Sequence, residues 1–171
     1  MYRLLFVAVL LTGCTATYDL DDEWAPLTQI IERPGNDRWL TTIGDKVVVA
    51  NLEEFLRRNP PTGLKFRTNL AHEQTHSVRQ FDYGVEKFLA RYVTDRSFRW
   101  EEEQLGWFVG LRLMRQYGMY WHVEGVVQSL LSYRPVLSSE EHIREWVRAV
   151  YNDTWKPKRT NLPAQYQYLC D

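Results

Sequence analysis

The 171-residue chain has only two cysteines, no block of positive charge and no apolar run long enough to cross a bilayer as a mature helix. Its 21 Lys and Arg residues are spread along the chain and are balanced by 22 Asp and Glu residues. Because phosphate binding needs a concentrated basic face, this pattern argues against nucleic acid as a main partner. Large aromatic residues, in contrast, are plentiful. Seven Trp and ten Tyr can fill the core of the single domain that the length indicates.

The N-terminus has the organisation of a secretory signal. Met1–Arg3 carries one positive charge, Leu4–Leu11 is a short apolar run, and small residues follow before Cys14. The Leu-Thr-Gly-Cys ending resembles a bacterial lipobox, which implies cleavage before Cys14 and diacylglycerol on its thiol. The alternatives are an ordinary signal peptide or a buried strand that contains a cysteine. Thr15 stands where an Asp would suggest inner-membrane retention, so we expect attachment to the outer membrane, facing the periplasm.

The second cysteine, Cys170, is the penultimate residue. If Cys14 is lipidated, Cys170 has no partner for an intramolecular disulfide. We therefore expect Cys170 to be an exposed thiol, either free or paired with another molecule. Nothing in the sequence indicates an oligomeric state.

Three segments are expected along the chain: a signal peptide over residues 1–13, a lipidated cysteine with a tether over 14–37, and one domain over 38–171. Within the tether, the residues predict a short helix around Leu27–Glu32 and a turn at Pro34–Asp37.

The domain begins with a hairpin signal. Trp39–Ile43 and Lys46–Ala50 are β-rich runs on either side of Gly44 and Asp45. A series of helices follows, predicted over Leu52–Arg58, Gly63–Phe81, Val85–Val93, Glu101–Tyr117, Val123–Leu131 and Glu140–Tyr151. The tail from Asn152 is expected to be irregular. A short β-hairpin followed by a mostly helical bundle is an α+β fold.

One short motif carries chemistry. His72 and His76 are four residues apart, so a helix places both imidazoles on one face, where they can bind one metal ion at about 2.0–2.1 Å. Glu73 lies beside the first histidine, where it can hydrogen-bond a metal-bound water. Zinc lowers the pKa of such a water toward about 7, so a carboxylate can take its proton. The alternative is a pair of surface histidines beside a solvated glutamate.

These residues resemble the zincin metallopeptidases, and more narrowly the minimal zincins of bacteria and phages with a His-Glu-x-x-His-x-x-x-Gln core. In this chain that core is His72, Glu73, His76 and Gln80. The resemblance covers roughly residues 39–115 and includes the later segments Tyr83-Gly84, Phe88–Tyr92 and Arg99–Glu103. It implies a zinc-dependent hydrolase with Glu73 as general base. The chain from Gly118 lies outside the resemblance and is expected to be a helical C-terminal extension of the zincin-like domain.

A third protein ligand would leave one coordination position open for water. Asp82 has the spacing of an aspartate ligand in metzincin-like enzymes, but Arg79 stands where those enzymes need glycine. Asp95 has nearly the spacing of a third ligand in other zincins, but it lies beside Arg96 in an expected loop.

Glu101 and Glu103 are the stronger candidates for the third ligand. The unshifted family pattern favours Glu101, whereas the small residue that the family tends to carry three positions later is present only for Glu103, as Gly106. Both candidates stay open, and the alternative is a solvated helix N-terminus, where acids are favoured by the helix dipole.

Four further residues are weaker candidates. Gln80 lies one turn after His76 and could orient a ligand, or it could be an ordinary polar helix residue. Tyr117, Tyr120 and His122 could stabilise an oxyanion, although simple packing explains them better.

We therefore expect a lipid-anchored zinc metallopeptidase that hydrolyses peptide bonds of an envelope protein. Zn²⁺ would be held by His72, His76 and either Glu101 or Glu103. The alternative is a non-catalytic envelope lipoprotein whose zinc site is structural or decayed and which acts as an interaction module.

Overall fold

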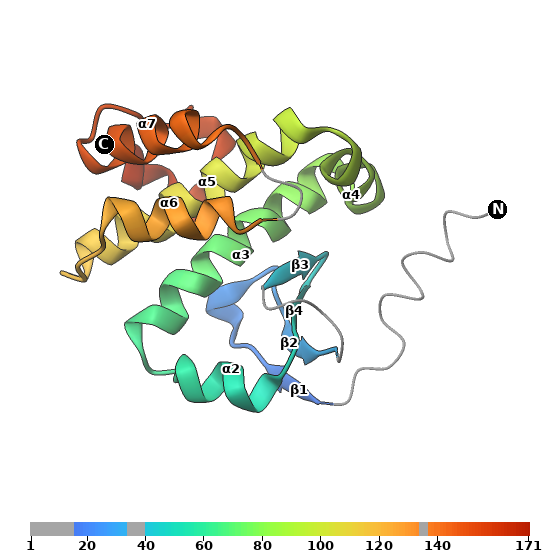
Figure 1. Ribbon diagram of the computed structural model, residues 1–171. Coiled ribbons are helices and arrows are strands. Elements are labelled where there is room, and N and C mark those ends of the chain that lie inside the picture. Colours follow the sequence, from blue (N-terminus) through green and yellow to red (C-terminus); the bar gives the residue numbers. More distant parts are fainter. Residues whose placement is uncertain (1–15, 34–39, 134–136) are drawn as a thin grey trace.

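The computed structural model describes residues 16–33, 40–133 and 137–171. An N-terminal four-stranded mixed sheet is followed by helices, so the predicted α+β class is confirmed (Figure 1). The predicted signal peptide, Cys14 and the turn at Pro34–Asp37 lie outside the described residues. Among the residues described, no helix has the length and apolar character needed to cross a membrane.

The strands are β1 (Thr17–Asp19), β2 (Gln29–Glu32), β3 (Thr41–Ile43) and β4 (Lys46–Val49). They lie in the order β1-β2-β4-β3, with β2 and β4 parallel and the other two pairs antiparallel. The predicted hairpin is confirmed as β3 and β4, and Gly44 turns it at a φ of +59°. Strand β3 is therefore an edge of the sheet.

The segment expected to be a tether instead contributes two strands and a short 3₁₀ helix, η1 (Asp22–Trp24). The helix expected around Leu27–Glu32 is wrong, because Gln29–Glu32 is strand β2 with Ile30 and Ile31 buried. β-Branched residues fit a pleated sheet well, and here the parallel pairing with β4 decides the conformation.

The predicted helices are all present, with shifts of a few residues at their ends. They are α2 (Leu52–Arg58), α3 (Leu64–Tyr83), α4 (Val85–Thr94), α5 (Arg96–Gln116), α6 (Val123–Leu131) and α7 (Glu140–Tyr151). The largest shift is in α5, which begins at Arg96 rather than Glu101 because Asp95 caps it by accepting from the Phe98 N–H at 3.0 Å. The acidic run therefore lies inside the helix rather than at its start.

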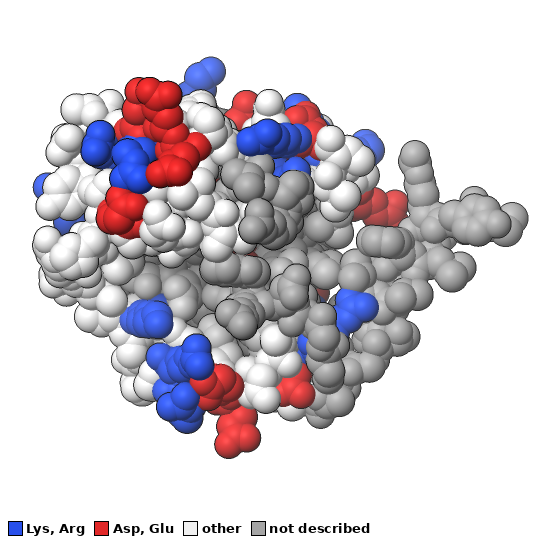
Figure 2. Space-filling view, viewed as in Figure 1, with Lys and Arg blue, Asp and Glu red and all other residues white. Residues whose placement is uncertain are grey.

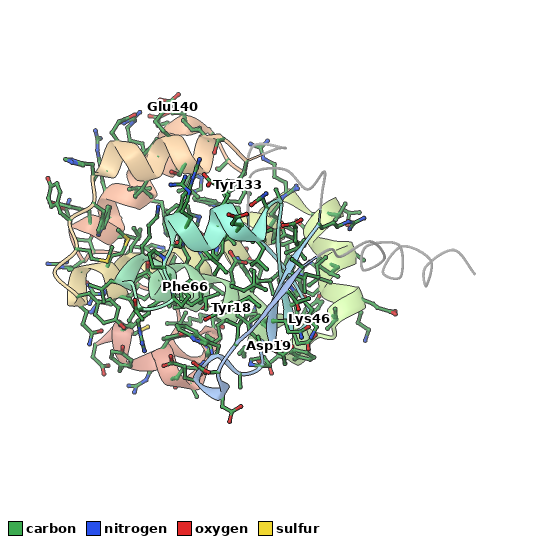
Figure 3. All side chains as sticks on the ribbon, turned by 90° about the horizontal axis from the view of Figure 1, so that it is seen from below. Tyr18, Asp19, Lys46, Phe66, Tyr133 and Glu140 are labelled. Carbon is green, nitrogen blue, oxygen red and sulfur yellow. The ribbon has the colours of Figure 1, made fainter. Side chains whose placement is uncertain are left out.

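Helix α3 is the centre of the molecule. The sheet and α2 lie on one side of it, and α5, α6 and α7 lie on the other (Figure 1). Tyr18 of β1 and Phe66 of α3, both labelled in Figure 3, meet edge-on with ring centroids 6.3 Å apart. Contacts of this kind make the first strands part of the core.

The tail after α7 is irregular, as expected, but it is also packed. It contains the 3₁₀ helices η2 (Arg159–Asn161) and η3 (Ala164–Cys170), and Tyr166 and Leu169 are buried. Cys170 is half-buried rather than exposed, and its thiol donates to the Pro157 carbonyl at 3.7 Å. On the face shown in Figure 2, basic side chains mostly lie beside acidic ones.

Candidate metal centre

Helices α3 and α5 bring three metal-ligating side chains together. His72 and His76 of α3 and Glu103 of α5 each offer a ligand atom, and these atoms all lie within 4.8 Å of one another. The two Nε2 atoms are 3.0 Å apart. Glu103 faces them from the opposite helix, with Oε2 3.6 Å from His72 Nε2 and Oε1 3.5 Å from His76 Nε2. The one-face geometry expected from the spacing of the two histidines is therefore present.

A glycine makes this close approach of the two helices possible. Gly106 lies one turn after Glu103, and a Cβ placed there would be 2.9 Å from both Cδ2 and Nε2 of the His72 ring. Real Cβ atoms essentially never approach another atom so closely, and a larger residue would push the ring aside. The small residue three positions after Glu103 thus has a defined steric reason.

The other candidate third ligands lie elsewhere. Glu101 is exposed, and Asp82 is exposed near the end of α3. Asp95 is occupied by its cap of α5 and by an ion pair with Arg91 at 3.1 Å. Of the four candidates, the structure places only Glu103 beside the two histidines.

The middle acid of the run, Glu102, has a different partner. Its buried carboxylate forms a two-bond ion pair with Arg79 of α3, at 2.7 and 3.1 Å. Arg79, which argued against Asp82 as a ligand, therefore joins α3 to α5 next to the cluster. Three consecutive glutamates have three separate environments: solvent, an arginine and the histidine pair.

Charge and burial act in opposite directions on the three candidate ligands. Burial lowers the pKa of His76 to about 4, although the charge of Glu103 opposes the shift. Burial also lowers the pKa of His72, but the nearby carboxylates of Glu103 and Glu73 raise it above its ordinary value. Burial raises the pKa of Glu103, yet the two histidines and Tyr92 bring it down to about 2. Glu103 is therefore an anion at neutral pH.

Two buried polar atoms of the cluster have no hydrogen-bond partner among the described residues: Glu103 Oε2 and His76 Nδ1. A carboxylate oxygen buried without a donor costs roughly 1–3 kcal/mol or more in lost hydration. A cation among the three side chains would remove that cost for Oε2, and two imidazoles with one carboxylate are ordinary ligands of a divalent metal. The buried group could therefore hold a metal ion.

Glu73 lies beside this group, on the side facing the sheet. Its side chain is buried, and Thr42 of β3 donates to Oε2 at 2.7 Å. Burial raises the pKa of Glu73, while the charge of His72 and the Thr42 hydrogen bond oppose the shift. A carboxyl group in this environment holds a proton more readily than one in water.

Gln80 forms hydrogen bonds with the β3–β4 hairpin rather than with a histidine. Its Oε1 accepts from the Gly44 N–H at 2.7 Å, and its Nε2 donates to the Thr42 carbonyl at 2.8 Å. Ser77 adds a bond from its hydroxyl to the Gly44 carbonyl at 2.6 Å. Both residues lie on α3 after His76 and hold β3 against the helix, which keeps the Thr42 hydroxyl on Glu73.

Aromatic residues for which the sequence predicted no separate role surround the cluster. The Tyr92 hydroxyl of α4 donates to Glu103 Oε1. The Trp107 ring meets His72 edge-on at 5.7 Å, and its Nε1 donates to the Tyr133 hydroxyl at 3.3 Å. Phe88 and Tyr92 are four residues apart on α4, and that spacing was the available signal for a face turned toward the cluster.

The residues proposed for an oxyanion lie elsewhere. Tyr120 is 74 % exposed and its ring packs on His122. Tyr117 lines a different cavity of about 180 Å³, together with Arg67 and Tyr166. The tyrosines that do lie near the cluster are Tyr92 and Tyr133.

Comparisons of the chain with models of protein families, with curated proteins and with solved structures found no match. Any function therefore has to be argued from the geometry of the site itself.

Proposed function

We propose that the protein is a zinc-dependent metallopeptidase. His72, His76 and Glu103 hold Zn²⁺, and Glu73 is the general base. One observation carries this proposal: a carboxylate from a second helix faces the histidine pair of the His-Glu-x-x-His motif, and one of its oxygens is buried with no hydrogen-bond partner among the described residues. Two histidines with one carboxylate are the protein ligands of several catalytic zinc sites, which keep a fourth position open.

The chain's own residues supply the proton chemistry. When bound, Zn²⁺ supplies a Lewis acid that polarises a carbonyl group and lowers the pKa of water from about 15.7 to about 7. Thr42 holds Oε2 of Glu73, so Oε1 is the atom that accepts a proton from the attacking water. The raised pKa of Glu73 lets it keep that proton until the leaving amine takes it.

The test compares three purified proteins: the wild type, Glu73→Gln, and the double variant His72→Ala/His76→Ala. Zinc content is measured first, and a peptide library analysed by mass spectrometry then serves as substrate. We expect about one zinc per chain and hydrolysis in the wild type, zinc without hydrolysis in Glu73→Gln, and neither in the double variant. Loss of a general base typically costs 10²- to 10⁴-fold in rate. Unchanged hydrolysis in Glu73→Gln would overturn the role of that residue.

A second candidate function is a non-catalytic envelope protein with a structural zinc site. The burial of the site favours it, because Glu73 is only 5 % and Glu103 only 3 % exposed, and a substrate needs access. Full zinc occupancy without hydrolysis of any library peptide would support this function over the peptidase.

We also propose that the protein is anchored to the outer membrane through a lipid on Cys14. The support comes from the sequence alone, in the charged start, the short apolar run and the Leu-Thr-Gly-Cys ending. Cys14→Ser should move the protein from the membrane fraction to the soluble fraction of lysed cells. An unchanged distribution between the fractions would contradict the anchor.

A further inference from the structure

The two oxygens of the Glu103 carboxylate have unequal environments. Oε1 accepts a hydrogen bond from the Tyr92 hydroxyl of α4. Oε2 is buried, has no hydrogen-bond partner among the described residues, and lies 3.6 Å from His72 Nε2. Both oxygens therefore face the histidine pair, since Oε1 lies 3.5 Å from His76 Nε2, but only Oε1 also receives a hydrogen bond from Tyr92.

A glutamate carboxylate is not positioned by its own side chain alone. Its last torsion is broad and roughly two-fold, so either oxygen, or both, could face a cation unless a neighbour fixes the plane. Within the described residues, the Tyr92 hydroxyl donates to Oε1 of this carboxylate, and the Tyr133 hydroxyl also lies near Glu103. From this arrangement we infer that Tyr92 is a positioning residue, which makes Glu103 a one-oxygen metal ligand through Oε2. The inference rests on the metal site of the proposed function but not on its hydrolytic activity.

Tyr92 is itself held rigidly enough for this role. Its ring stacks on Phe88 at 5.9 Å with 16° between the planes, and the Arg99 guanidinium lies 5.8 Å from its centroid. The same ring meets His76 edge-on at 6.4 Å. Tyr92 therefore contacts two of the three candidate ligands, one through its hydroxyl and one through its ring. The ring contact also supports the orientation of His76, whose Nδ1 has no partner among the described residues.

Binding through one oxygen of Glu103 would leave a coordination position of the metal free. Two imidazoles and one carboxylate oxygen occupy three positions and leave the fourth of a tetrahedral zinc site open. If both oxygens bound, the carboxylate would compete for that position. Hydrogen-bonded partners of metal ligands typically contribute 10- to 100-fold to metal affinity or activity.

Tyr92→Phe isolates the hydroxyl, because phenylalanine keeps the ring that packs on Phe88 and His76. Tyr83→Phe is the matched control, since the Tyr83 hydroxyl accepts from Arg91 at 3.2 Å and lies away from the cluster. Zinc affinity is measured by competition with a chromophoric chelator. Co²⁺ in place of Zn²⁺ reports coordination number through its visible absorption.

We expect Tyr92→Phe to bind zinc about 10- to 100-fold more weakly than the wild type and to change the Co²⁺ spectrum. Tyr83→Phe should leave both unchanged. Wild-type zinc affinity and an unchanged Co²⁺ spectrum in Tyr92→Phe would overturn the inference. If the wild type binds zinc and Tyr92→Phe shows the expected change, but no peptide is hydrolysed, only the peptidase proposal fails.

A crystal structure of the zinc-loaded wild type tests the same point if Tyr92→Phe does not fold. We expect Oε2 on the metal and Oε1 still bonded to Tyr92. Binding through Oε1, binding through both oxygens, or a wild type that takes up no zinc would each overturn the inference.

Discussion

Helix α3 buries polar side chains on two faces, which differ in how their polar groups are hydrogen-bonded. One carries Gln74, and the other carries the histidine pair of the cluster. Gln74 is a spacer residue of the His-Glu-x-x-His motif and is only 1 % exposed. The polar groups of the Gln74 face are buried for the fold, and those of the histidine face are placed as they would be around a ligand.

On the first face every polar group of the side chain has a partner. Gln74 Nε2 donates to the carbonyls of Glu23 at 3.2 Å and Ala25 at 2.7 Å, and Oε1 accepts from the Tyr166 hydroxyl. Those partners come from the N-terminal segment and from the tail, so one glutamine joins both ends of the described chain to α3. Because all polar groups of the buried Gln74 side chain already have protein partners, this residue stabilises the fold and needs no ligand.

The second face leaves atoms without partners. Glu103 Oε2 and His76 Nδ1 are unpartnered among the described residues, but so are the indole N–H groups of Trp100 and Trp146 in the helical core. An unpartnered atom therefore does not mark a site by itself. The cluster differs because an anionic oxygen and two imidazole nitrogens converge on one point, as they do around a cation.

Removing the anionic ligand should have the largest effect on zinc affinity. Glu103→Ala is expected to weaken zinc binding by more than the roughly 10- to 100-fold typical of losing an outer partner, because a direct ligand is lost. Glu101→Ala, two residues away and exposed, should leave zinc affinity unchanged. Competition titrations measure both. Equal weakening in the two variants would contradict the assignment of Glu103.

A steric change on α5 should have the next largest effect. In Gly106→Ala the new methyl group would lie 2.9 Å from the His72 ring, so the ring must move and zinc affinity should fall about tenfold or more, comparable to the loss of an outer partner. The control is Gly110→Ala, one turn later, where the nearest atom is the Thr68 carbonyl oxygen at an ordinary 3.5 Å. If both alanines leave zinc affinity unchanged, the glycine is not needed for the site.

Changing the structural face should give the smallest effect on metal and a measurable effect on stability. Gln74→Leu removes three hydrogen bonds and leaves buried partners unsatisfied, so we expect a loss of about 1–3 kcal/mol in the free energy of unfolding. Zinc affinity should stay at the wild-type value. Urea unfolding and the same titration measure the two quantities. A large loss of zinc affinity in a folded Gln74→Leu protein would mean that the two faces are coupled.

Local features could be predicted well from the sequence. The helices, the β3–β4 hairpin and the placement of His72, Glu73 and His76 on one helix follow from periodicity, turn residues and spacing, which neighbours in the chain determine. The strand β2 could not be predicted in this way. Its conformation depends on pairing with β4, more than ten residues later in the chain.

The third candidate ligand shows the same division. The sequence by itself limited it to a few acids and noted the small residue after Glu103, because composition and offset are local properties. Only the tertiary structure chose among Glu101, Glu102 and Glu103, since the rotation of α5 against α3 decides which of three adjacent side chains meets solvent, Arg79 or the histidines. Tyr92 and Thr42 likewise reached the site through the packing of α4 and β3 on α3. Helical periodicity is encoded within a few residues, whereas the partner of a buried charge is set by elements that meet only when the chain has folded.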